Sequence, residues 1–168
     1  MLDNIHIIKV GGIGTIFQID HVNDFLKYNE IGIGFYKLGD ISKKTEDELL
    51  EKACEIYKDE GPRIKGYLLR FRDKIKIGDP VIAYMSPNTV VAVGRIKSDY
   101  LFRKDRNRDS KEGLGLPHRR KVEWMKEPQN FSRYKLPDYV SRRVALPPTF
   151  ITINYNFNEI EKVLEKIS

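Results

Sequence analysis

The sequence of 168 residues contains one cysteine, Cys54, and one tryptophan, Trp124. A single cysteine excludes an internal disulfide and a zinc site built on cysteines. The three histidines show no metal-ligand spacing and the motif G-x-S-x-G is absent, so no hydrolase site is indicated. No apolar run approaches the roughly 20 residues of a membrane helix, and no signal peptide opens the chain. These absences favour a cytoplasmic protein with a single domain, residues 1–168.

Positive charge is distributed unevenly along the chain. The net charge is +6, from 30 Lys and Arg against 24 Asp and Glu. Residues 95–143 hold 15 Lys and Arg against 7 Asp and Glu, whereas the rest of the chain holds 15 against 17. This concentration favours a polyanionic partner. The alternative is the ionic surface of a thermophilic protein, which the abundance of Lys, Glu and Ile and the presence of only two glutamines also suggest.

Hydrophobic periodicity predicts short strands interleaved with helices. Strands are expected where apolar and β-branched residues cluster or alternate, at 5–10, 15–19, 80–84, 89–96 and 150–155, at the start of 30–42 and within 117–125. Helices are expected at 20–28, 45–62, 63–71 and 158–168. Loops are expected at 103–115, which is charged and has no apolar period, and at 131–149, which offers one helical turn.

Two of the predicted helices carry capping signals. Thr45 and Glu48 form a capping box at the start of one, and Asn158 with Glu161 is expected to cap the last. Because the strands outnumber the helices and pair locally, we expect an α+β fold, a small curved β-barrel flanked by helices.

Motifs for nucleotide or metal chemistry are weak. The glycines of 11–14 and 32–34 meet neither G-x-G-x-x-G nor the phosphate-loop pattern with its Lys-Ser/Thr pair. A magnesium nuclease would need acids such as Asp99, Asp109 and Glu123, but Asp109 falls in the charged loop, where metal geometry would not be held. We therefore expect no catalytic residue, no metal and no cofactor in this chain.

Several aromatic residues lie near strand ends and beside cations. Phe35 and Tyr36 end one expected strand, Tyr84 ends another, Tyr100 and Phe102 end a third, and Trp124 ends a fourth after the cationic run 119–121. Aromatic side chains on neighbouring strands can form a stacking pocket for a base or a cage around a methylated group. The alternative for each of them is packing in the core.

Three segments in order carry a resemblance to a known family: IGIGFYKLGDIS (31–42), KIGDPVIAYMSPNTVVAVGRIKSDY (76–100) and PHRRKVEW (117–124). They resemble the EVE-type branch of the PUA-like superfamily, which also includes the YTH and ASCH domains. They are more closely similar to the EVE-like modules at the N-terminus of McrB-type, modification-dependent restriction proteins. The resemblance covers about residues 31–125.

The resemblance implies a small curved, PUA-like β-barrel flanked by helices, which binds nucleic acid and reads a modified base flipped out of DNA. Phe35 stands where those domains carry tryptophan. The base pocket would comprise Phe35, Tyr36, Tyr84, Ser86, Asn88 and Trp124, although Asn88 is also a frequent turn former. The phosphate contacts would come from Arg103, Lys104, Arg106, Arg108, His118, Arg119, Arg120, Lys121, Arg142 and Arg143.

The resemblance also implies a wider setting. The chain would be a monomeric recognition domain from a longer McrB-type protein active in antiviral defence. GTP or another nucleotide with Mg would belong to a downstream AAA+ motor, and a McrC-like nuclease subunit would be the partner. No membrane partner is expected. Two further alternatives stay open: a PUA-like RNA-binding domain, and an assembly module that binds protein.

Overall fold

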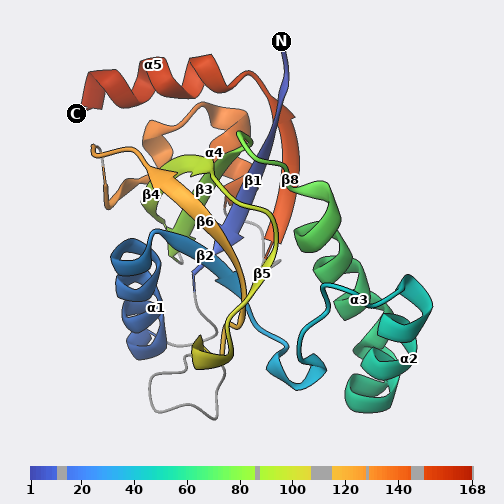
Figure 1. Cartoon of the computed structure of the whole chain (residues 1–168). Coiled ribbons are helices and arrows are strands. Elements are labelled where there is room, and N and C mark those ends of the chain that lie inside the picture. Colours follow the sequence, from blue (N-terminus) through green and yellow to red (C-terminus); the bar gives the residue numbers. More distant parts are fainter. Residues whose placement is uncertain (11–14, 86–87, 107–114, 128, 145–149, 168) are drawn as a thin grey trace.

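The structure is a computed structural model that describes residues 1–10, 15–85, 88–106, 115–127, 129–144 and 150–167. A strongly curled mixed sheet forms its centre, and helices pack around this sheet (Figure 1). The predicted α+β class and the curvature of the sheet are confirmed.

The sheet runs in the order β2-β6-β4-β3-β1-β8, with β5 paired to β6 and β7 paired to β4. Its strands are β1 (Asp3–Lys9), β2 (Glu30–Ile33), β3 (Pro80–Met85), β4 (Thr89–Ile96), β5 (Leu101–Phe102), β6 (His118–Trp124), β7 (Phe131–Ser132) and β8 (Phe150–Tyr155). β1 and β3 pair in parallel, and the other pairs are antiparallel. Because this path ends at β2 and β8 in the described part of the chain, the sheet is a half-barrel rather than a closed barrel.

Helices cover the sheet and connect its strands. The α-helices are α1 (Thr15–Tyr28), α2 (Glu46–Tyr57), α3 (Gly61–Leu69), α4 (Asp138–Val144) and α5 (Phe157–Ile167). Shorter helical turns are η1 (Tyr36–Leu38), η2 (Lys58–Glu60), η3 (Arg70–Lys74, a π-turn that continues α3), η4 (Lys104–Arg106) and η5 (Arg133–Lys135).

Two hydrophobic cores lie on opposite faces of the sheet. Along β3, Val81 and Ala83 belong to the first core, whereas Ile82 and Tyr84 belong to the second. This division follows from the two-residue period of a strand. Residues of α1, α2 and α3 complete the first core, and residues of α4 and α5 complete the second.

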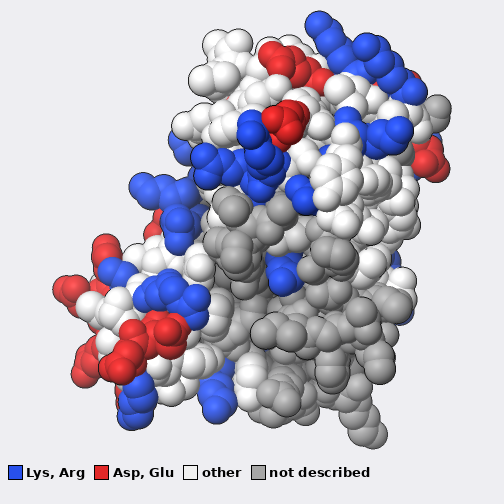
Figure 2. Space-filling view, turned by 180° about the vertical axis from the view of Figure 1, so that it is seen from behind, with Lys and Arg blue, Asp and Glu red and all other residues white. Residues whose placement is uncertain are grey.

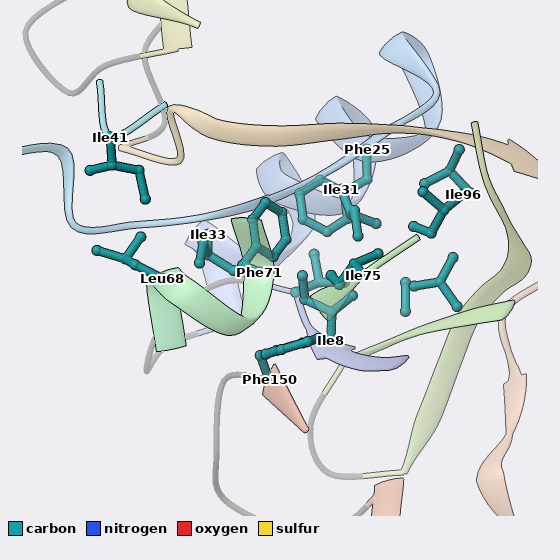
Figure 3. Close-up of a cluster of buried hydrophobic side chains, with 14 of the residues drawn as sticks. Ile8, Phe25, Ile31, Ile33, Ile41, Leu68, Phe71, Ile75, Ile96 and Phe150 are labelled. Carbon is teal, nitrogen blue, oxygen red and sulfur yellow. The ribbon is translucent and has the colours of Figure 1, made fainter. Parts of the chain in front are cut away.

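The first core joins the helices to β2. Figure 3 shows Leu68 of α3 and Phe71 of η3 beside Ile31 and Ile33 of β2. All four side chains are at most 1% exposed. This packing places the end of α3 against the strand that leads into η1, and so it positions the surface around residue 35.

Two segments differ from the sequence prediction. Residues 15–19, which were expected to form a strand, are the start of α1. The β-branched composition of that segment favoured a strand, and such composition is only a weak guide to secondary structure. Residues 131–149 were expected to be a loop with one helical turn, but 131–132 form β7, 133–135 form η5 and 138–144 form helix α4. In α4, Val140 and Val144 lie one turn apart and both pack in the second core.

The helix caps are confirmed at α2 and differ at α5. The Glu48 amide donates to Thr45 Oγ1 (3.2 Å) and the Thr45 amide donates to Glu48 Oε2 (2.8 Å), which completes the predicted capping box. At α5, Asn156 Oδ1 accepts from the Asn158 amide (3.2 Å), so the cap lies two residues before the one predicted.

Candidate functional site

The structure separates the aromatic residues that were expected to form one pocket. Ile33, just before Phe35, pairs with His118 at the start of β6. Trp124, at the end of β6, pairs with Gly94 of β4. Six residues of strand correspond to about 20 Å at a rise of about 3.3 Å per residue. Phe35 and Trp124 therefore do not line the same pocket, and that prediction is wrong.

Trp124 has a role of its own in packing. The half-buried indole packs against the first core, and Nε1 donates to the Phe25 carbonyl (3.2 Å). Its exposed part lines a separate groove of about 290 Å³ together with Arg95, Phe157 and Glu161, among others. The side chain thus ties β6 to α1.

The other predicted pocket residues also lie elsewhere. Tyr84 is 3% exposed and belongs to the second core, on the face of β3 opposite the first core. Asn88 is exposed, and its Oδ1 accepts from Arg133 Nε (3.0 Å). Ser86 lies outside the described residues. Burial of Tyr84 removes it from any surface pocket.

A different set of rings does gather at the start of β6, and we call it the aromatic cluster: Phe35, Tyr57, Tyr100, Phe102 and His118. The rings of Tyr100 and Phe102 lie 5.8 Å and 5.6 Å from the His118 ring, centre to centre. Phe35 meets Tyr57, the last residue of α2, edge to face at 6.0 Å. His118 is buried, while the four other rings are partly exposed. The cluster therefore exposes aromatic surface to solvent, and the buried His118 ring lies beneath it.

Phe35 adopts a backbone conformation that is unfavourable for a bulky residue. Its φ is 69° and its ψ is 36°, in the left-handed region. Such a residue stores about 1–3 kcal/mol of strain, and strain of this kind concentrates at functional sites. The Phe35 carbonyl accepts from the Leu38 amide (3.0 Å) and from His118 Nε2 (3.5 Å). These contacts hold the strained turn, which places the ring at the surface beside Tyr57.

His118 and Tyr100 form a neutral, hydrogen-bonded pair beneath the cluster. Burial lowers the pKa of His118 to about 4, so the ring is uncharged at neutral pH. Tyr100 donates its hydroxyl proton to His118 Nδ1 (2.7 Å), which leaves the Nε2–H to donate to the Phe35 carbonyl. Burial also raises the pKa of Tyr100. His118 was predicted to contact phosphate, and burial as a neutral ring excludes that role.

The cationic run that follows His118 is buried instead of exposed. Arg119 is 0% exposed, and its Nη2 lies 2.5 Å from Asp24 Oδ2 of α1. Its Nε donates to the Leu116 carbonyl (2.5 Å), and its stem crosses Gly32, where a Cβ would come within 2.7 Å of Arg119 Cδ. The glycine is needed for this close approach. The prediction that Arg119 contacts phosphate is corrected by its burial against α1.

Arg120 points to the other face of β6 and is 1% exposed. Its Nε donates to the Phe71 carbonyl (2.8 Å), Nη2 to the Arg72 carbonyl (2.5 Å) and Nη1 to the Ser98 carbonyl (2.9 Å). The carbonyls at 71 and 72 belong to the last turn of a helix, where intrahelical partners run out. Arg120 thus caps the α3–η3 helix, and this role replaces the predicted phosphate contact.

The remaining predicted phosphate ligands differ in exposure. Lys104, Lys121, Arg142 and Arg143 are exposed. Arg103 is partly exposed, with Nη2 2.6 Å from Oε1 of the buried Glu30. Arg108 and the side chain of Arg106 lie outside the described residues. Lys104 lies two residues after Phe102 of the aromatic cluster, whereas Lys121 lies three residues beyond His118 on β6, opposite Glu30.

A groove of about 370 Å³ adjoins the aromatic cluster at Tyr100 and was missed by the sequence analysis. It is lined by Ser42, Lys43, Lys44, Thr45, Arg72, Asp73, Asp99 and Tyr100. Arg72 Nη1 donates to the carbonyls of Ile41 (2.8 Å) and Lys44 (2.6 Å), which fixes the segment that carries the two lysines. The adjacent pair of lysines was the only signal in the sequence.

Charge on the molecule is segregated. Figure 2, which views it from behind, shows basic side chains predominating on the upper half, whereas both signs alternate over α2 and α3 at the lower left.

The acids considered for a nuclease do not suggest a metal site. Glu123 pairs with Lys97 (2.5 Å), Asp99 lines the groove at Tyr100, and Asp109 lies outside the described residues. Within the described ranges, no three His, Cys, Asp or Glu residues are grouped so that they could hold a metal ion.

Comparison with known proteins identifies a family without a known role. In the part of the chain that the structure describes, no helix is long and apolar enough to span a membrane. A search of curated proteins found no match. The family DUF8426, described as a domain of unknown function, matches residues 12–143, which include β2, the aromatic cluster and β6. The chain therefore belongs to the DUF8426 family.

Proposed function

We propose that this chain is a PUA-like, nucleic-acid binding module that reads a modified base flipped out of DNA, as the recognition domain of a McrB-type restriction system. The observation that carries the proposal is the aromatic cluster, in which the strained backbone of Phe35 is hydrogen-bonded to a neutral His118–Tyr100 pair. The curled mixed sheet with flanking helices is compatible with a PUA-like fold.

The cluster has the chemistry for binding a planar base. Extruding a base costs a few kcal/mol, and stacking on an aromatic ring returns about 1–3 kcal/mol per base. Phe35 and Tyr57 contact each other edge to face, so the base would stack on the exposed part of one of these rings, and Tyr36 follows Phe35 in sequence. The neutral floor suits an uncharged methylated base, because the His118–Tyr100 pair itself offers a charged group no counter-ion.

Nearby exposed cations would hold the nucleic-acid backbone. Lys43 and Lys44 line the groove that meets the cluster at Tyr100, and Lys104 lies two residues after Phe102 of the cluster. Phosphate contacts of this kind set position and make affinity depend on salt, while the ring contacts supply selectivity.

In this proposal the chain binds and does not cut. Nucleotide hydrolysis with GTP or a similar nucleotide and Mg, and cleavage by a McrC-like nuclease, would belong to other polypeptide segments. The isolated domain would act as a monomer in the cytoplasm.

The test is fluorescence anisotropy at two salt concentrations. The probes are matched duplexes that are unmodified or carry N6-methyladenine, 5-methylcytosine or 5-hydroxymethylcytosine, with one RNA of the same sequence. A preference for one modified duplex that persists at the higher salt supports the proposal. Equal or tighter binding to RNA would favour an RNA-binding domain instead, and no binding to any probe would favour an assembly module.

Variants at Phe35 locate the pocket. Phe35→Ala removes the ring and is expected to abolish the preference for the modified base, a loss of about 5- to 150-fold in discrimination. Phe35→Trp enlarges the stacking surface and is expected to keep or increase it. If Phe35→Ala folds normally and keeps full discrimination, the base does not bind at this cluster.

A further inference from the structure

A second surface combines exposed tyrosines with cations, far from the aromatic cluster. Tyr134 is 66% exposed and Tyr139 is 40% exposed, although large aromatic side chains are ordinarily well covered. We call it the tyrosine–arginine surface, and its members are Arg133, Tyr134, Lys135, Tyr139, Arg142 and Arg143. All six come from η5 and α4.

Arg133 fixes the position of Tyr134. Its guanidinium lies 4.4 Å from the centre of the Tyr134 ring, and Nη2 lies 3.0 Å from the tyrosine hydroxyl. Nη1 donates to the Ser141 carbonyl (2.7 Å) and Nε donates to Asn88 Oδ1 (3.0 Å), so the guanidinium is held from three sides. The ring is therefore backed by a fixed cation and remains largely open to solvent. A platform that is already ordered loses little entropy when a ligand stacks on it.

The rest of the surface supplies positive charge. Tyr139 stacks on Tyr155 at 5.9 Å, with an angle of 16° between the rings, and the Arg143 guanidinium lies 5.2 Å from the Tyr139 ring. Arg142 pairs with Asp138 (2.8 Å), a contact between two highly exposed groups that a ligand can replace. Lys135 is exposed beside Tyr134.

This surface and the aromatic cluster are built on different cores. Leu136 and Val140, which anchor η5 and α4, belong to the second core. Phe35, Tyr57 and Tyr100 pack against the first core, on the opposite face of the sheet. One flipped base cannot contact both, so the tyrosine–arginine surface needs a ligand of its own.

We propose that the tyrosine–arginine surface binds a single-stranded segment of nucleic acid, with a base stacked on Tyr134 and phosphates held by Lys135, Arg142 and Arg143. The inference rests on the proposed nucleic-acid binding function and extends it to a second contact. A planar ring with an open face next to several cations matches the two requirements of single strands, stacking and backbone neutralisation. An acidic peptide would use the cations and leave the open face of Tyr134 without a partner.

The test uses fluorescein-labelled oligo(dT) of about 15 nucleotides, a length close to the upper range of such sites. Tyr134→Ala is expected to weaken its binding about 5- to 150-fold, and Tyr134→Phe is expected to bind like the wild type because the ring remains. Tyr67→Ala is the matched control: Tyr67 is also a partly exposed tyrosine, with Arg63 and Arg70 within 5.8 Å and 5.2 Å of its ring. It is expected to bind like the wild type.

The outcomes separate this inference from the proposed function. If Tyr134→Ala weakens oligo(dT) binding and keeps the preference for the modified duplex, both stand. If the wild type binds the modified duplex but ignores oligo(dT), or if Tyr134→Ala binds oligo(dT) as the wild type does, the second surface is refuted and the proposed function remains. If polyglutamate displaces the labelled strand equally from the wild type and from Tyr134→Ala, the surface recognises acidic protein rather than bases. If the wild type binds no nucleic acid, both fail together.

Discussion

Replacing Arg120 should destabilise the fold and leave the surface unchanged. Arg120→Met keeps the apolar stem and removes the guanidinium, which leaves the carbonyls of Phe71, Arg72 and Ser98 without their donor. A hydrogen bond to a charged group contributes about 1.5–3 kcal/mol, and the Ser98 carbonyl, whose bond is only partly buried, can be hydrated instead. We therefore expect the free energy of unfolding to fall by about 3–5 kcal/mol.

The neighbouring residue provides the matched control. Lys121 follows Arg120 on β6 but is exposed, so Lys121→Met should change the free energy of unfolding by less than about 0.5 kcal/mol. Arg120→Lys retains a single, shorter donor group, so its free energy of unfolding should lie between those of the two methionine variants, about 2–3 kcal/mol below the wild type. Urea unfolding followed by the fluorescence of Trp124, the single tryptophan, measures all three. If Arg120→Met lowers the free energy of unfolding by less than about 1 kcal/mol and also weakens nucleic-acid binding, the capping role is refuted and the predicted phosphate contact is supported.

Three more predictions concern contacts in the same region. Gly32→Ala places a Cβ 2.7 Å from Arg119 Cδ and should lower the free energy of unfolding by about 1–3 kcal/mol; an unchanged melting temperature would contradict this contact. The pKa of His118 is about 4 in the folded chain, against 6.5 for an unperturbed histidine, so the unfolded chain binds the proton first as pH falls. The contribution of His118 to the free energy of unfolding should therefore be fully present above pH 6.5 and fall by up to about 3 kcal/mol as pH falls to 4. In His118→Gln the free energy of unfolding should depend less on pH over this range. An equal pH dependence in both proteins would argue against a buried neutral ring. Trp124→Phe loses the hydrogen bond to the Phe25 carbonyl and should cost about 1–2 kcal/mol without changing base discrimination, whereas reduced discrimination would return Trp124 to the pocket.

Local sequence signals predicted most of the elements. Alternation and β-branched runs located β1, β3, β4, β6 and β8, and the capping box of Thr45 and Glu48 located the start of α2. These signals act within a few residues, because side-chain direction in a strand and hydrogen bonds at a helix start depend on near neighbours. They failed at residues 15–19, where the β-branched composition favours a strand but the backbone begins helix α1.

The candidate site was only partly predictable for the same reason. Phe35 and Tyr36 were found because they follow a short strand, whereas Tyr57, Tyr100 and Phe102 belong to other elements and join them only through the fold. His118 was interpreted as a cationic neighbour of arginines, and its neutral state results from burial beneath these rings.

What the sequence determined by itself was the alternation of strands and helices, the α+β class and the concentration of positive charge in one third of the chain. What only the tertiary structure decided was which of those charges face solvent. Arg119 and Arg120 point to opposite faces of β6, and both faces are covered, by Asp24 of α1 and by carbonyls 49 and 48 residues away in sequence. A buried arginine is stable only where hydrogen-bond acceptors satisfy its donors. Here those acceptors come from residues distant in sequence, so the residues next to Arg119 and Arg120 do not predict them.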